Sequence, residues 1–232
     1  MDYVYVCRRG DNEELRYSIR SLVKNLPDVN VWVIGDAPSW YTGNIVRVKY
    51  FREKYLTVRH NLKVLSQTSE INEDFVLMND DFFVMHPMDS VQVWHGGSLR
   101  DKHRLRSQTQ PYSPYTQYLL ETYKTVKDSG IEEPLDYELH TPLPTTKSSI
   151  AEAIKLPGLW RSITGNQNGI GGEQHDDVKL YHPTSQMYRD REDLDSSPYL
   201  SCDDDSFGTL LTKYLMDAFP DPSPYEAIDA DA

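Results

Sequence analysis

Two adjacent aspartates follow an apolar run in the segment FVLMNDDFFV. Phe75 to Met78 is typical of a buried strand, so Asn79, Asp80 and Asp81 would stand at its carboxyl end. Ligands of open parallel sheets bind beyond the carboxyl ends of strands, and a diphosphate held with Mg²⁺ or Mn²⁺ needs one or two protein carboxylates. Because side chains alternate along a strand, we expect the two carboxylates to diverge, one toward a metal and its neighbour toward a ligand or a loop. A solvated Asp-Asp turn is an equally good interpretation of these residues alone.

A second group of polar side chains surrounds the start of the first expected helix, in the segment CRRGDNEELRYS. Helix amino-termini attract phosphate and guanidinium groups bind phosphate oxygens in pairs, so this junction could grip a nucleotide. The simpler interpretation is that Asp11 forms a capping box with Glu14, while Arg16 and Arg20 make a solvated helical stripe. Spacing alone favours this structural interpretation over a nucleotide site built from Arg8, Arg9, Asp11, Asn12 and Arg16.

Two further candidates lie downstream without a diagnostic spacing. His140 is flanked by prolines in LHTPLPTTKSSIAE, and Arg161 follows in GLWRSITGN. A histidine titrates near neutrality and can serve as a general base, although a lone histidine is more often a structural residue.

Acidic side chains gather again near the end of the chain. The run CDDDS at 202–206 either completes a metal site or caps the last helix through Asp205 or Ser206, and capping is the default interpretation. The segment HDD at 175–177 follows a glycine-rich loop and is a weaker metal candidate.

Strands alternating with helices over the first ninety residues must position these groups. Such an alternation predicts an α/β fold, in which a mostly parallel sheet is covered by helices on both faces. The expected strands are residues 3–7, 29–34, 45–51 and 75–78, and the expected helices are residues 11–26 and 57–68.

Beyond Pro87 the pattern becomes less regular. The polar, basic segment 96–112 is expected to be a flexible loop, and 166–172 (NQNGIGG) a mobile one. Helices are expected from Pro114 to about Lys127, from Thr145 or Thr146 to Lys155, and over an amphipathic stretch from Leu210 to Phe219. We expect one catalytic domain over 1–232, with a donor-binding half (1–95), an insertion (96–135), an acceptor and catalytic half (136–226) and a fraying tail (227–232).

Composition excludes several classes of function. The chain has 232 residues and a formal net charge of −12, and we find no Lys/Arg cluster in it, so nucleic acid is an unexpected partner. An anionic nucleotide would need positive charge concentrated in its pocket. The start lacks a signal pattern and no apolar window could span a bilayer, which predicts a cytoplasmic protein without a transmembrane segment. Cys7 and Cys202 are expected to be reduced thiols in or near the core.

Four segments in order resemble the Stealth family, which includes bacterial capsular polysaccharide phosphotransferases and the enzyme that adds N-acetylglucosamine-1-phosphate to lysosomal glycoproteins. DNEELRYSIRSL, VWVIGDAPSWY, LTVRHN and FVLMNDDFFVMHP look like the family's second conserved region. HTPLPTTKSSIAE with Trp160 and Arg161 looks like the third, and YLSCDDDSFG through FPDPSPYE like the fourth. The first region is reduced to MDYVYVCRRG, and Asp203 stands where the family usually has asparagine.

The resemblance implies a glycosyltransferase-A-like fold, a nucleotide-sugar donor and a glycan or polysaccharide acceptor. It raises the nucleotide-binding interpretation of the first junction above the capping one. A divalent metal, Mg²⁺ or Mn²⁺, is implied as cofactor. The implied roles are catalysis for Asp81, His140 and Arg161, donor binding for Asp11, Asn12, Arg16, Asn61 and Asp80, and metal ligation for Asp81 and Asp204.

Three hypotheses for function follow from this resemblance and the charged set. The main one is transfer of a sugar-1-phosphate, in which an acceptor hydroxyl attacks the phosphorus next to the sugar, His140 takes the proton and nucleoside monophosphate leaves. The second is a glycosyltransferase that releases nucleoside diphosphate, for which a carboxylate would be the more natural base. The third is a sugar- or nucleotide-binding module without catalysis.

Overall fold

The computed structural model describes residues 1–10, 12–181 and 194–227, and its centre is a five-stranded sheet. The strand order is β3 (Asn44–Arg47), β2 (Asn30–Gly35), β1 (Asp2–Val6), β4 (Asp74–Met78) and β7 (Leu143–Thr146). β1, β2, β3 and β4 run parallel, whereas β7 pairs antiparallel with β4. The predicted mostly parallel α/β sheet is therefore confirmed.

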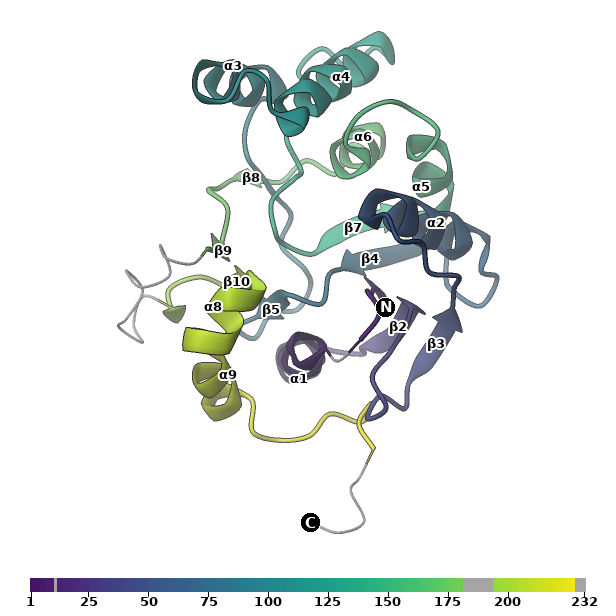
Figure 1. Cartoon of the computed structure of the whole chain (residues 1–232), viewed down its shortest axis with the longest axis vertical. Helices are drawn as coiled ribbons and strands as arrows, with labels where there is room; N and C mark the ends of the chain where they lie inside the picture. Colours follow the sequence, from purple (N-terminus) through teal and green to yellow (C-terminus); the bar gives the residue numbers. More distant parts are fainter. Residues whose placement is uncertain (11, 182–193, 228–232) are drawn as a thin grey trace.

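Helices cover both faces of this sheet because its strands alternate apolar side chains between two cores (Figure 1). Tyr3 and Tyr5 of β1 face α1 (Glu13–Asn25), while Val4 faces the side covered by α2 (Lys54–Gln67) and α5 (Lys147–Ala153). The predicted helices 11–26 and 57–68 correspond to α1 and α2. The predicted strand 45–51 is confirmed at its start and ends earlier, at Arg47.

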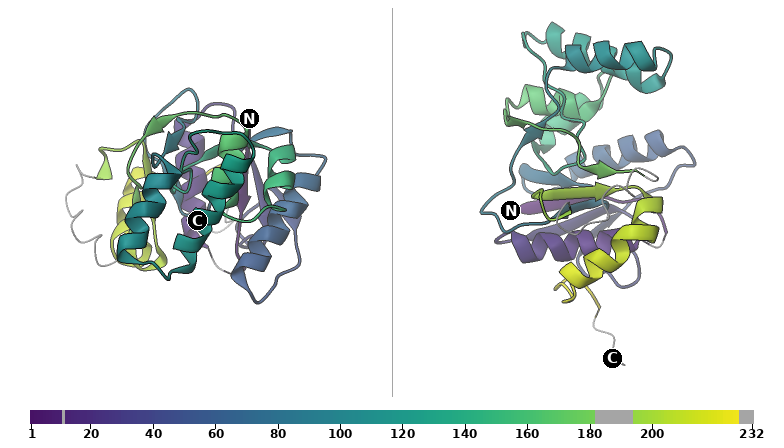
Figure 2. Two further views of the ribbon diagram at one scale, coloured as in Figure 1. Left: turned by 90° about the horizontal axis from the view of Figure 1, so that it is seen from above. Right: turned by 90° about the vertical axis from the view of Figure 1, so that its left-hand side faces the viewer.

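The segment 96–112 is not the flexible loop that its polar composition suggested. Residues Leu99–Thr109 form α3, which packs beside α4 (Pro114–Asp128). Figure 2 shows this helix pair as a separate layer beyond α6 (Trp160–Gln167), away from the sheet. α6 also replaces the first part of the predicted loop 166–172. Its side chains hold it in place, because Ser162 and Asn166 hydrogen-bond the backbone of residues 135–137.

Short strands form two smaller sheets beside the central one. β5 (Phe82–Val84) pairs with β10 (Tyr199–Cys202), which pairs with β9 (Lys179–Leu180), and β6 (Trp94–His95) pairs with β8 (Glu173–Gln174). The expected last helix is three consecutive pieces, α8 (Asp204–Ser206), the π-helical η2 (Phe207–Leu211) and α9 (Thr212–Ala218). The expected helix 145–155 is shorter, since residues up to Thr146 belong to β7 and Thr146 caps α5.

Residues 223–227 return to the start of the chain and pack against α1 and β2. Glu226 forms an ion pair with Arg20 at 2.6 Å, and it also accepts from the backbone N–H of Ser223. The hydroxyl of Tyr225 donates to the carbonyl of Val29 at 2.8 Å. Burial raises the pKa of Glu226, but the hydrogen bonds from Arg20 outweigh it and lower the pKa overall. The two ends of the described chain are thus fastened together.

Candidate functional site

One polar cluster lies where the order of strands changes sides, because the chain first adds strands on one side of β1 and then on the other. β2 and β3 lie on one side of β1 and β4 lies on the other, so the carboxyl ends of β1 and β4 flank the crevice where open α/β sheets bind ligands. Asn12, after β1, donates from its side-chain amide to Asp80, after β4, at 2.6 Å. The same Asn12 side chain accepts from the backbone N–H of Leu15 and caps α1. Asn12 thereby ties the helix start to the aspartate turn.

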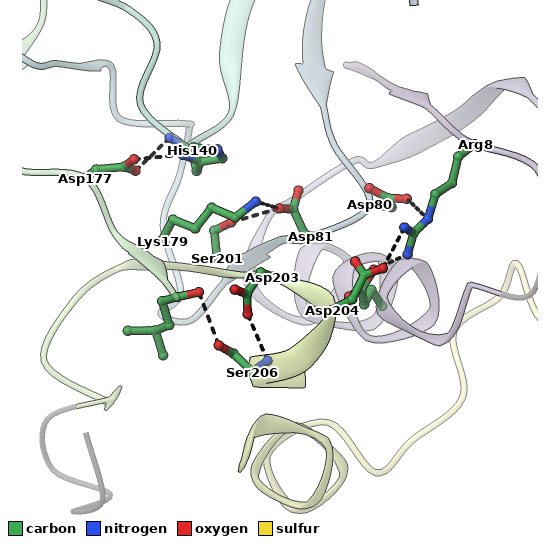
Figure 3. A network of polar contacts seen from close by, with 12 residues as sticks. Arg8, Asp80, Asp81, His140, Asp177, Lys179, Ser201, Asp203, Asp204 and Ser206 are labelled. Atoms are coloured by element: carbon green, nitrogen blue, oxygen red, sulfur yellow. Dashed lines mark hydrogen bonds and ion pairs between the residues drawn. The ribbon is translucent and has the colours of Figure 1, made fainter. Parts of the chain in front are cut away.

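Arg8 is the cation of this cluster and lies beside Asp80 and Asp204 (Figure 3), with Glu14 as a third carboxylate partner. Its guanidinium lies 2.8 Å from Asp204, 3.3 Å from Glu14 and 3.9 Å from Asp80. Burial, followed by the charges of Asp80 and Asp204, raises the pKa of Glu14 to about 7. Burial and the neighbouring Asp81 also raise the pKa of Asp80. The carboxylates of Glu14, Asp80 and Asp204 thus share the guanidinium of Arg8, and the raised pKa values of Glu14 and Asp80 reflect their burial and the negative charges beside them.

Asp81 points away from Asp80, as alternation along the strand predicted (Figure 3). One of its carboxylate oxygens accepts from the ammonium group of Lys179 at 2.8 Å and from the hydroxyl of Ser201 at 3.2 Å. Both charged side chains are largely buried, with exposed fractions of 12% for Asp81 and 15% for Lys179. Burial lowers the pKa of Lys179, but Asp81 outweighs this effect and the pKa rises overall. The pair thus brings a fixed positive charge next to the aspartate turn.

His140 is held by Asp177 in the manner of an oriented base. The imidazole Nδ1 lies 2.7 Å from one carboxylate oxygen of Asp177, and the backbone N–H of His140 donates to the other oxygen at 3.0 Å. Burial raises the pKa of Asp177, yet the hydrogen bonds and charge of His140 outweigh it and lower the pKa. A carboxylate at Nδ1 places the proton there and leaves Nε2 as the acceptor. The geometry therefore equips His140 to take a proton from a hydroxyl group.

His140 and Arg161 both contact Phe82, the residue that follows the two aspartates. The His140 ring meets the Phe82 ring edge to face at 6.2 Å between centroids, and the Arg161 guanidinium lies 5.6 Å from that centroid. The structure thus brings these two predicted catalytic residues to the same turn as Asp81.

Arg161 is a buried organiser of the backbone that carries His140. Its guanidinium donates to the carbonyls of Tyr137, Leu139 and Thr141 at 2.7–3.1 Å, so the chain wraps around it on both sides of His140. Burial lowers the pKa of Arg161. Its Nη1 is buried and has no hydrogen-bond partner among the described residues. These contacts make Arg161 a positioning residue.

A separate cavity of about 260 Å³ opens beside the ends of β1 and β2, and Asn61 of α2 lines it. Asn61 is only 2% exposed, and its side-chain oxygen has no hydrogen-bond partner in the described parts of the chain. At Gly35 a side chain is impossible, because a Cβ would lie 2.3 Å from the Cys7 carbonyl oxygen and φ is +128°. The oxygen of Asn61 is thus an acceptor free to take a hydrogen bond beside the cavity, within the described residues. The cavity is lined by Cys7, Arg9, Gly35, Asp36, Arg47, Val48, Lys49, Tyr50, Thr57 and Asn61.

Arg16 is not part of this assembly. Its guanidinium contacts Glu13 at 3.2 Å and Glu226 at 3.8 Å, and it packs over the ring of Trp40 at 4.8 Å. Glu13 belongs to α1 and Glu226 to the segment 223–227 that packs against α1. These contacts stabilise the packing of that segment and do not lead toward the aspartate turn. Asp11 lies outside the described residues, and Asn12 holds the cap position that a capping box had assigned to Asp11.

The acidic run 202–206 caps the helix that follows it, but through a different residue from those predicted. Asp203 accepts from the backbone N–H of Ser206 at 2.8 Å, so Asp203 is the cap in place of Asp205 or Ser206. Asp204 turns to Arg8 and joins the cluster. Both cysteines are free and buried, as expected.

The carboxylates fit a metal ion poorly in this arrangement. Across residues 1–10, 12–181 and 194–227, no three His, Cys, Asp or Glu side chains converge as a metal-binding group. The oxygens of Asp80 and Asp204 that would face an ion already face Arg8, and Asp81 faces Lys179. Ligation by Asp81 and Asp204 therefore stays a prediction, and we derive no chemical step through a metal.

Sequence reasoning missed the partners that complete the site. Lys179 and Ser201 lie 98 and 120 positions from Asp81, and no local pattern around either residue marks it. Asp177 was noticed only as a weak metal candidate, and its position 37 residues after His140 gave no sign of their contact. The tertiary fold alone brings these residues together.

The chain matches no protein-family model and no curated sequence. It is similar to the solved structure of an active-site mutant of LgtC, with a TM-score of 0.47, 12% identity and coverage of 100% of this chain and 98% of that chain. A second match is the galactosyltransferase LgtC with donor and acceptor sugar analogs, with a TM-score of 0.42, 12% identity and the same coverage. A third is the apo-form glycosyltransferase GlyE of Streptococcus pneumoniae TIGR4, with a TM-score of 0.30, 10% identity and coverage of 99% of this chain and 55% of that chain.

Scores of this size establish neither a function nor a family. The resemblance to the Stealth family therefore remains a prediction, and so does the glycosyltransferase-A-like arrangement. No helix within the described ranges combines the length and the apolar character needed to cross a bilayer.

Proposed function

We propose that this chain is a nucleotide-sugar-dependent transferase that passes a sugar-1-phosphate to a hydroxyl group of a glycan or polysaccharide acceptor. The observation that carries the proposal is the His140–Asp177 pair, which sets an oriented base against Phe82, next to the aspartate turn. Asp80 and Asp81 on this turn contact Arg8 and Lys179, so the acidic turn has two cations beside it.

The donor nucleotide would occupy the cavity at the ends of β1 and β2. Arg9, Arg47 and Lys49 line it together with Asp36, which pairs with Arg47 at 2.7 Å, so the lining has a net positive charge that would favour an anionic nucleotide. The unpaired oxygen of Asn61 would accept a hydrogen bond from the nucleoside. In this proposal residues 1–95 hold the donor in a glycosyltransferase-A-like sheet, and residues 136–226 supply the base and the acceptor site.

The reaction that fits these groups begins when His140 Nε2 removes the proton of an acceptor hydroxyl. The acceptor oxygen forms a bond to the phosphorus next to the sugar, and the bond between that phosphorus and the bridging oxygen of the diphosphate breaks. The electron pair leaves with nucleoside monophosphate. Arg8 and Lys179 would offset the charge that develops on the phosphate oxygens, because positioning and electrostatic stabilisation supply most of the rate in phosphoryl transfer.

The test is to incubate the purified chain with a panel of nucleotide sugars and sugar acceptors, with and without Mn²⁺, and to separate the nucleotide products. Nucleoside monophosphate is the expected product. Nucleoside diphosphate would instead assign transfer of the sugar alone, which is the second hypothesis. Donor binding without breakdown, for every acceptor tried, would leave a binding module.

Variants in the same assay test whether His140 acts as the base, by comparison with a histidine outside the site. His140→Ala should lower turnover by roughly 10²–10⁴-fold, the usual contribution of a general base. His103→Ala is the matched control, because His103 lies on α3 and its ring Nε2 lies 3.1 Å from the hydroxyl of Ser107, a residue of the same helix. Wild-type turnover in both His140→Ala and Asp81→Ala would overturn the proposal.

A further inference from the structure

The outer side of α2 and the segment before it carry a concentration of positive charge. Residues 47–67 contain six lysines and arginines against one acidic residue, Glu53, whereas the whole chain has 24 basic and 36 acidic residues. The sequence prediction that no basic cluster interrupts the acidic chain is wrong for this segment. Arg52, Arg59 and Lys63 are exposed, and none of them forms an ion pair with a described carboxylate.

Large apolar side chains are exposed among these cations. Tyr55 is 71% exposed, Leu56 is 51% exposed and Tyr50 is 54% exposed. Polar residues would be expected at such positions of a helix that faces only water. Exposed apolar groups that alternate with unpaired cations indicate a binding surface.

A groove of about 600 Å³ runs between α2 and α5, which lie side by side on the face of the sheet opposite α1 (Figure 1). Its lining divides by chemistry. The apolar part comes from Phe51, Leu56, Ala151 and Ile154, and the cationic part from Arg59, Lys63 and Lys155. Lys155 pairs with Glu152 at 2.6 Å, so Arg59 and Lys63 are the cations available to a ligand. A ligand that combines an apolar chain with an anionic head fits this division.

We propose that α2 docks onto the surface of a bilayer that contains anionic lipid, with Leu56 and Tyr55 entering the interface and Arg59 and Lys63 contacting headgroup phosphates. Helices that lie in the membrane interface combine Lys and Arg with Leu and aromatic residues in this way. The net charge of −12 repels an anionic bilayer from the remaining surface, which fixes the orientation in which the chain docks. Nucleic acid would also attract the cations, but it offers no partner for the apolar lining of the groove.

The test is co-sedimentation of the whole chain with phosphatidylcholine vesicles that contain either no anionic lipid or 30% phosphatidylglycerol, a fraction chosen as roughly that of an anionic leaflet. We expect binding only to the phosphatidylglycerol vesicles. The double variant R59Q/K63Q should reduce the partition coefficient by at least about tenfold, since each cation near the surface contributes several-fold. Leu56→Ser should also weaken binding, because it removes an inserted apolar side chain.

A charge-matched control uses the other basic helix. The double variant R100Q/R104Q removes two exposed cations from α3 and should bind like the wild type. Equal losses in both double variants would show nonspecific attraction and overturn the docking of α2. The proposal also fails if phosphatidylglycerol does not promote binding, or if a short DNA duplex binds in an R59Q/K63Q-sensitive manner while vesicles do not. No donor or acceptor is needed, so the result stands apart from the transferase assay.

Discussion

Replacing Arg161 by methionine separates two roles for this residue, chemistry on a substrate and organisation of the backbone around His140. Arg161→Met keeps the apolar stem and removes the guanidinium, which leaves the carbonyls of Tyr137, Leu139 and Thr141 without their donor. A residue that acted only on substrate would lower turnover at unchanged stability. The contacts predict instead that stability and turnover fall together.

The size of the effect follows from those three hydrogen bonds. A hydrogen bond from a charged donor contributes about 1.5–3 kcal/mol, so the gross loss is roughly 4–9 kcal/mol. Part of it is recovered, because a buried guanidinium is itself costly, as the lowered pKa of Arg161 indicates. Glu138, whose pKa is raised by burial and lowered by Arg161, loses its nearby cation at the same time. We expect a net decrease of about 3–5 kcal/mol in the free energy of unfolding, the usual result of removing one member of a buried charged network.

Guanidinium chloride unfolding, followed by circular dichroism, measures this difference. Arg100→Met is the control, since Arg100 is exposed on α3 and forms no ion pair with a carboxylate of the described residues, and its change should stay within about 0.5 kcal/mol. A free energy of unfolding for Arg161→Met within about 0.5 kcal/mol of wild type would refute the positioning role. Such a result combined with lost turnover would return Arg161 to the list of groups that touch substrate.

Three other changes test the charges of the site. Because the pKa of Glu14 is about 7 in the folded chain and lower in the unfolded chain, the folded state binds more protons between pH 4.5 and 7, and Glu14 lowers stability as pH rises through that range. Glu14→Gln removes this pH dependence, so its stability advantage over the wild type should increase from pH 4.5 to 7 and stay constant above pH 7. A stability difference that does not change with pH in thermal melts would contradict this. Asp177→Asn should lower kcat at least about tenfold while the donor KM changes little, since it removes the carboxylate that orients His140 through Nδ1, and an unchanged kcat would exclude the pair from catalysis. Arg8→Gln leaves Asp80 and its neighbours without their shared cation, so Mn²⁺ affinity in calorimetric titration should rise at least about tenfold, and equal affinity would show that Arg8 does not compete with a metal.

The parts of the fold that the sequence predicted are those with strong local periodicity. The buried strands and α1 repeat apolar residues at the spacing of their element, and both periods are visible without tertiary information. α3 was missed because Leu99 is its one buried residue in the described structure, so its segment shows no apolar stripe. α6 was missed because glycine and asparagine suggested a loop, whereas Ser162 and Asn166 stabilise the helix through contacts with residues 135–137.

The candidate site divides in the same way. Asp80 and Asp81 were found because an apolar strand delivers them to the sheet edge, and that signal is local. His140 and Arg161 came from a resemblance of motifs, and the structure places both at Phe82. The role of Lys179 could not be predicted, because no sequence pattern near it indicates that it pairs with Asp81, a buried aspartate 98 positions away.

The fastening of residues 223–227 to α1 also sets an order of events during synthesis. Arg20 emerges from the ribosome early, but Glu226, its carboxylate partner, follows 206 positions later. In the folded chain Arg20 is 12% exposed and Glu226 is 6% exposed, so the guanidinium of Arg20 lacks this carboxylate partner until residue 226 has been made. A protease should therefore reach α1 more readily in stalled chains that end before residue 223 than in released ones. The packing of the first helix is thus completed by residues that lie about 200 positions later in the chain.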